Sequence, residues 1–78
     1  MEQSLNTLQE GQSGRITSLH TGAAVKRRLL DFGLMEGTEI RCLRRGPAGS
    51  PVLYLVRGTM LALRNTDSAG IFVKRCRS

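Results

Sequence analysis

Residues 27–45, RRLLDFGLMEGTEIRCLRR, decide how this chain is built, because a helical pattern gives way to a strand pattern within them. Val25, Leu29 and Phe32 are spaced at i, i+4 and i+7, which places three apolar side chains on one helical face. The pattern stops at a glycine. We therefore expect a helix over residues 23–32.

Two glycines, Gly33 and Gly37, lie between this helix and the strand that follows. Gly33 occupies the position where a glycine ends a helix in the left-handed conformation, and Leu34 then folds back on the last turn. A phosphate-binding loop is the alternative, but it requires further glycines, a Lys-Ser/Thr pair and a helix after the loop. Here the helix precedes the glycines. We therefore interpret the pair as a structural corner, packed by Leu29, Phe32 and Leu34.

Strand patterns fill most of the remaining chain. The expected strands cover residues 13–19, 38–45, 52–56, 59–64 and 71–74. Arg57 and Gly58 form a tight hairpin link, Leu5 and Leu8 suit one helical turn against the core, and residues 65–70 suggest a polar turn. Short links favour antiparallel pairing, since parallel strands need long crossovers. The sequence predicts one mainly β domain over residues 1–78, a small antiparallel barrel of about five strands with one short inserted α-helix.

Size and charge limit the possible functions. A chain of 78 residues buries a modest core and has little room for an enclosed active site, so we expect no enzyme activity. The net charge of +6 favours acidic partners, nucleic acid among them. Aromatic side chains are few, namely Phe32, Tyr54 and Phe72. Because single-strand readers stack bases on several aromatics, nucleic-acid binding is the less favoured alternative.

Metal ligands lack paired spacing in this chain. His20, Cys42 and Cys76 are the weak candidates, but no CxxC or HxxxH pattern joins them. Cys42 shares a strand face with Ile40, which is typical of a small core residue. We expect no metal and no cofactor. The start of the chain lacks a signal-peptide pattern and no segment has the apolar length of a membrane span, so we expect a cytoplasmic protein without direct membrane insertion.

The strand at residues 52–56, VLYLV, is apolar on both faces. One face carries Leu53 and Leu55, and in the last strand Phe72 opposes Ile71 and Val73 in the same way. A small barrel usually shows polar residues outside. The second apolar face is therefore covered either by the helix and the N-terminal turn or by another molecule.

The order of these motifs resembles the ferrous iron transport protein A (FeoA-type) family over nearly the whole chain. The segments SLNTLQEGQSGRI, VKRRLLDFGLMEGTEI, GSPVLYLVRGTMLALR and SAGIFV are similar to the successive motifs of that family. Its structural signature would correspond to Arg28, Leu29, Gly33, Leu34, Gly37 and Gly58. The resemblance implies an SH3-like barrel with an inserted helix.

The same resemblance implies a role. It points to a small accessory protein of bacterial ferrous iron uptake that binds the cytoplasmic GTP-binding domain of the membrane permease and is peripheral to the inner membrane through that partner. A related domain of iron-dependent repressors is the alternative, but no DNA-binding helix pair precedes this one and the domain is expected to be free-standing. For partner binding, or for self-association, we select Leu53, Leu55 and Phe72, with Lys26 and Arg27 at the rim.

Overall fold

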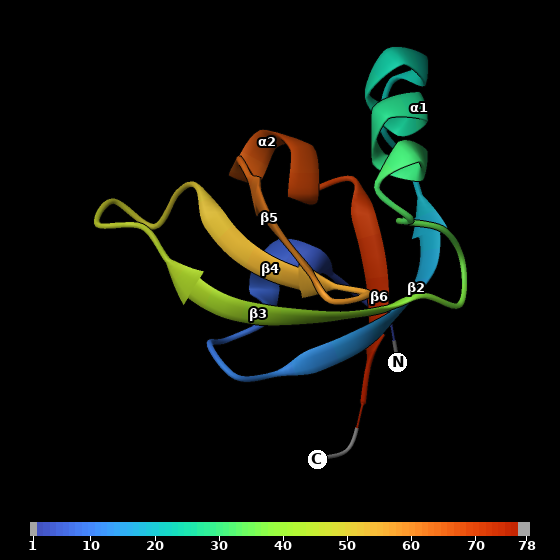
Figure 1. Cartoon of the computed structure of the whole chain (residues 1–78). Helices are drawn as coiled ribbons and strands as arrows, with labels where there is room; N and C mark the ends of the chain where they lie inside the picture. The colour runs from blue at the N-terminus through green and yellow to red at the C-terminus, as the bar shows by residue number, and fades with distance from the viewer. Residues whose placement is uncertain (1, 77–78) are drawn as a thin grey trace.

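The computed structural model describes residues 2–76, and the two ends of the predicted domain lie outside these residues. Its elements are β1 (Glu2–Ser4), a 3-10 turn η1 (Leu5–Thr7), β2 (Ser13–Leu19), α1 (Ala23–Asp31), β3 (Glu39–Arg45), β4 (Val52–Val56), β5 (Thr59–Leu63), α2 (Asn65–Ser68) and β6 (Ile71–Arg75). All strand pairs are antiparallel, in the order β1-β6-β2-β3-β4-β5. The sheet curls around the core, with α1 beyond the end of β2 (Figure 1). The mainly β prediction is confirmed.

Two short elements differ from the expectation of about five strands and one helix. β1 pairs with β6 and adds a sixth strand, although Glu-Gln-Ser has no apolar alternation to reveal it. Residues 65–70 hold the four-residue helix α2 where a polar turn was expected. Four residues are too few to show a helical period. None of the helices in residues 2–76 is long and apolar enough to cross a membrane.

The core consists of the inward side chains of the strands and four leucines from outside the sheet. Leu5 and Leu8 are fully buried on either end of η1, which confirms the helical turn expected there. Leu29 from α1 and Leu34 from the corner are buried as well. The strands contribute the remaining large buried side chains, namely Ile16, Ile40, Cys42, Val52, Tyr54, Val56, Leu63, Ile71 and Val73.

The corner after α1 has the hydrogen bonds of a Schellman motif. The Leu34 N–H donates to the Leu29 carbonyl at 3.0 Å, and the Gly33 N–H donates to the Leu30 carbonyl at 2.9 Å. Gly33 has φ +87°, in the left-handed region, as predicted. Phe32 differs from the expectation, because it is 46% exposed and does not pack the corner. The helix ends at Asp31, so the next residue no longer follows the buried helical face.

Candidate partner-binding site

The outward side chains of β3, β4 and β5 form a continuous apolar surface with arginines on one side. In the strand register Leu55 lies between Arg41 and Met60, and Leu53 lies between Arg44 and Ala62. Met60 is 66% exposed, and both leucines are half-buried. We name this surface the arginine-rimmed face, consisting of Arg41, Arg44, Leu53, Leu55, Met60 and Ala62.

A bulge in β3 determines which arginines reach this face. Between Cys42 and Arg44 the register with β4 shifts by one residue, because β3 advances by two residues while β4 advances by one. Arg44 therefore points outward beside Leu53, although strict alternation after Cys42 would turn it inward. Arg45 points inward instead, where one of its guanidinium nitrogens donates to the backbone carbonyls of η1 and the residue that follows it.

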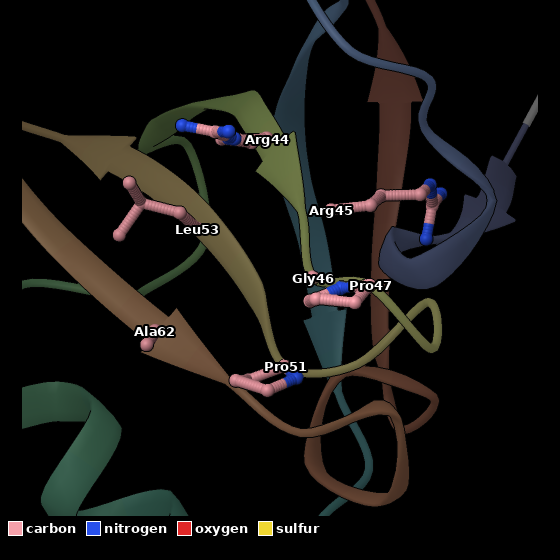
Figure 2. Close-up of a pocket in the computed structure, with 7 residues that line it drawn as sticks. All are labelled: Arg44, Arg45, Gly46, Pro47, Pro51, Leu53 and Ala62. Atoms are coloured by element: carbon pink, nitrogen blue, oxygen red, sulfur yellow. The ribbon is translucent and has the colours of Figure 1, made fainter.

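A hollow of about 340 Å³ opens at one end of the arginine-rimmed face. Figure 2 shows the residues around it, with Arg44 and Leu53 on the face and Arg45 directed away toward the N-terminal segment. Its lining consists of Arg44, Arg45, Gly46, Pro47, Pro51, Leu53 and Ala62. Four of these residues are apolar or proline, and the Arg44 guanidinium supplies positive charge, whereas the Arg45 guanidinium is bonded to the N-terminal segment. The hollow therefore suits an apolar side chain close to a carboxylate.

The two arginines of the face are not held in ion pairs within residues 2–76. Residues 2–76 contain one ion pair with an N–O distance of 4.0 Å or less, between Arg15 and Glu39 at 3.9 Å. Both side chains of this pair are mostly exposed. Arg41 and Arg44 on the rim have no such partner within that part of the chain. Exposed apolar side chains beside free guanidinium groups favour a partner surface that is apolar at the centre and acidic at the edge.

The structure brings together only part of the partner-binding set selected from the sequence. Leu53 and Leu55 are neighbours on the arginine-rimmed face. Phe72 lies on β6, which β2 and β3 separate from β4 in the sheet, and its ring meets the edge of His20 at 5.4 Å between centroids. Lys26 and Arg27 are exposed on α1.

Four residues of the face were not selected from the sequence: Arg41, Arg44, Met60 and Ala62. The two β5 residues could have been found, because a two-residue hairpin link fixes which residues of the two strands are opposite. Extending that register from Arg57-Gly58 pairs Leu55 with Met60 and Leu53 with Ala62.

The weak metal candidates are not gathered into a metal site. Within residues 2–76 no three His, Cys, Asp or Glu side chains are grouped closely enough to hold an ion. His20 Nε2 lies 3.1 Å from the Ser18 hydroxyl, and Cys76 follows β6 with its N–H donated to Ser13. Cys42 is fully buried. Burial raises the pKa of the Cys42 thiol, against a smaller lowering by the positive charge of Arg45.

Tyr54, opposite Cys42 in the register, also lies inside the barrel. Burial raises the pKa of the Tyr54 hydroxyl, and the nearby Ser68 hydroxyl lowers it only in part. Despite that proximity, the Tyr54 oxygen makes no hydrogen bond of good geometry within residues 2–76. Neither buried group has the exposure that a catalytic nucleophile needs.

The residues selected as a structural signature gather at the corner and the β4–β5 turn. Leu29 and Leu34 are core residues, while Gly33, Gly37 and Gly58 all have positive φ. Gly33 and the turn are in contact, because a Cβ on Gly33 would lie 3.0 Å from Cδ of Arg57. Arg28 is exposed in the last turn of α1, where a cation interacts favourably with the helix dipole.

We compared the chain with known protein families and with solved structures. The family model described as FeoA domain matches residues 3–75. The solution structure of a FeoA protein from Chlorobium tepidum has a TM-score of 0.92 and 33% identity, covering 96% of this chain and 71% of that chain. FeoA from Stenotrophomonas maltophilia, solved with zinc and described as a procaryotic SH3 domain protein, has a TM-score of 0.79 and 32% identity, covering 95% of this chain and 89% of that chain.

A manganese-dependent transcriptional repressor shares the fold at a TM-score of 0.85 and 17% identity, covering 96% of this chain and 37% of that longer chain. No match was found among curated proteins. The structures named FeoA thus align with this chain over most of both lengths, whereas the repressor contains the fold as one part.

Proposed function

The chain belongs to the FeoA domain family, whose members are small accessory proteins of ferrous iron transport and not a class of enzymes, and from this premise we propose that it binds the cytoplasmic GTP-binding domain of the ferrous iron permease. The arginine-rimmed face is the surface that makes the contact. Such an accessory changes transport by binding one conformation of the domain more tightly than another. It reaches the membrane through this partner and works from the cytoplasm.

The observation that carries the proposal is the exposure of apolar side chains beside free arginines. Covering one leucine or methionine side chain contributes roughly 1.5–3 kcal/mol when the side chain goes from full exposure to full burial. Leu53 and Leu55 are half-buried already and Met60 is 66% exposed, so each contributes part of that value. The guanidinium groups of Arg41 and Arg44 then select an acidic rim and accelerate the encounter.

Replacement of both leucines tests this surface. We expect a Leu53→Asp plus Leu55→Asp variant to stay folded and to lose binding to the purified GTP-binding domain, measured by isothermal titration calorimetry. The matched control is Gln9→Asp plus Ala69→Asp, which makes the same charge change at exposed residues outside the three strands. We expect the control to bind as the wild type does.

A milder variant decides the result if the double variant unfolds. Arg44 is exposed, so Arg44→Glu leaves the core intact and reverses one rim charge. We expect it to weaken binding, with a larger effect at low salt than at high salt. Equal affinity of Arg44→Glu and the wild type, or full binding by a folded double aspartate variant, would show that the partner uses another surface.

Nucleic-acid binding, which the net charge of +6 also suggests, has little support from the aromatic side chains. Tyr54 is fully buried, Phe72 is half-buried against His20, and of the three aromatic residues only Phe32 is classed as exposed. A row of exposed rings for base stacking is therefore not formed by residues 2–76. A gel shift with mixed single-stranded RNA at low salt separates the two functions, and we expect no retarded species.

A further inference from the structure

The strand β5 is the last strand of the sheet and has one open edge. It pairs with β4 only, in an unbroken register from Val56 with Thr59 to Val52 with Leu63. In a two-residue hairpin the residues next to the turn form a hydrogen-bonded pair, and every second pair along the strands does the same. The N–H and C=O groups of Met60 and Ala62 therefore point away from β4. Within residues 2–76 no backbone hydrogen bond joins residues 59–63 to a segment other than β4.

This edge lacks the features that protect exposed strands in most proteins. Natural edges carry lysine, proline or a bulge, or are very short. The sequence of β5, TMLAL, has neither charge nor proline, and its register is continuous. Met60 and Ala62 are both exposed. The opposite edge of the sheet, β1, has only three residues and carries Glu2.

Cations stand at both ends of this open strand. Arg57 precedes it and Arg64 follows it, and both side chains are exposed. Within residues 2–76 neither has a carboxylate within 4.0 Å. The Arg57 side chain reaches back toward the corner, with its Cδ 3.0 Å and a guanidinium nitrogen 3.7 Å from the Cβ position of Gly33. An extended segment along β5 would therefore meet a positively charged residue near each end of the strand.

Arg57 holds an unfavourable backbone conformation. Its φ is +52°, and Arg57 is the single non-glycine residue with a positive φ among residues 2–76. A type I′ hairpin turn prefers asparagine at this position, because other side chains are strained there. Strain of this kind is typical of residues that serve a function. An exposed arginine thus occupies a strained turn position directly at the start of β5.

We propose, resting on the function proposed above, that β5 accepts an extended segment of the partner domain as an additional antiparallel or parallel strand. The segment pairs its backbone with the N–H and C=O groups of Met60 and Ala62, and places carboxylates against Arg57 and Arg64. Alternate apolar side chains of the segment extend the apolar part of the arginine-rimmed face. This mode of recognition takes its affinity from the main chain and its specificity from side chains.

The charge of the strand ends favours such an acidic segment over a second copy of this chain. Two β5 strands paired antiparallel about Leu61 would bring Arg57 of one copy close to Arg64 of the other. Both copies also carry a net charge of +6. Like charges at the same end of a strand pair oppose association.

A pair of variants at Met60 separates backbone pairing from side-chain contact. Met60→Ala removes the side chain and keeps the N–H, whereas Met60→Pro removes both. Proline is tolerated in an edge strand where the N–H faces solvent. In calorimetric titration against the purified GTP-binding domain, we expect Met60→Pro to bind about tenfold more weakly than Met60→Ala, since a partner carbonyl is left unpaired.

Amide hydrogen exchange in the wild-type protein gives a result that does not depend on the folding of a variant. We expect the Met60 and Ala62 amides to exchange rapidly in the free protein and slowly in the complex. Binding with unprotected amides at both positions, or equal affinities of the two variants, overturns strand addition and leaves the proposed function intact. Protection of these amides in concentrated protein without the partner would show that a second copy pairs with the edge. That result would also overturn strand addition by the partner. Absence of binding by the wild type overturns the proposed function itself.

Discussion

Alanine at Gly33 tests the corner in which α1, β3 and the β4–β5 turn meet. The residue has φ +87°, and a Cβ there would lie 3.0 Å from Cδ of Arg57. Gly37, four residues further, is a matched control, because its φ is +89° and nothing lies within 4 Å of its Cβ position. The two substitutions share the backbone strain and differ in the contact with Arg57.

The expected losses follow from these distances. An alanine in the left-handed region costs about 1–2 kcal/mol, and a smaller unfolded-state entropy returns about 0.4–1 kcal/mol, so that Gly37→Ala should lose about 1 kcal/mol of unfolding free energy. Gly33→Ala adds the displacement of Arg57 from its preferred rotamer, about 0.5–1.5 kcal/mol, which brings its loss to about 2 kcal/mol. For a chain of this length the second value lowers Tm by about 8–16 °C.

Urea unfolding followed by far-ultraviolet circular dichroism measures both losses. Tyr54 is the single tyrosine and is fully buried, so its fluorescence provides an independent probe of the same transition. Agreement of the two probes establishes two-state unfolding. Each glycine variant is then repeated in an Arg57→Ala background, which keeps the turn and removes the side chain that contacts Gly33.

The background experiment decides between strain and contact. We expect Arg57→Ala to recover the additional loss of Gly33→Ala and to leave that of Gly37→Ala unchanged. Equal losses for the two glycine variants, with no effect of Arg57→Ala, would refute the contact between the corner and the turn. No loss in either variant would refute the left-handed conformations themselves.

Two further predictions concern stability. Burial raises the pKa of Tyr54 and of Cys42 above their ordinary values of 10.0 and 9.0. Because both groups ionise at lower pH in the unfolded state, we expect the full unfolding free energy below about pH 9 and a decline as the pH rises further. Urea midpoints in reducing buffer across this range should show a shallower decline for Tyr54→Phe, and an identical decline would contradict the assignment. Gly70→Ala would place a Cβ 2.7 Å from the His20 carbonyl oxygen, and we expect a loss of about 3 kcal/mol in the same assay. Gly22→Ala, with nothing within 4 Å of its Cβ position, is the control and should lose far less.

Local rules allowed the corner and the β4–β5 hairpin to be predicted from the sequence. The helix stop at Gly33 and the two-residue link at Arg57-Gly58 depend on residues next to one another in the chain, and both are found in the structure. The buried positions of β4 follow from strict alternation in VLYLV. Phe32 was misplaced because α1 ends at Asp31, one residue before it, so that Phe32 no longer follows the helical period.

The distribution of the proposed binding residues depends on non-local structure that no sequence period contains. Phe72 was grouped with Leu53 because both are outward apolar residues, but β6 pairs with β1 and β2 and lies far from β4 in the sheet order. The bulge at Leu43 has no signal in the sequence, yet it exchanges the faces of Arg44 and Arg45. One arginine therefore joins the arginine-rimmed face and the other stabilises the N-terminal turn.

A nuclear magnetic resonance titration with the purified GTP-binding domain shows which surface of the protein the partner contacts. We expect the amide signals of β3, β4 and β5 to shift or broaden, with the largest changes at Leu53, Leu55, Met60 and Ala62, while those of β1 and β6 remain unchanged. Binding of the domain without changes on β3, β4 and β5, or with changes centred on Phe72 and β6, would contradict the assignment of the contact to the arginine-rimmed face.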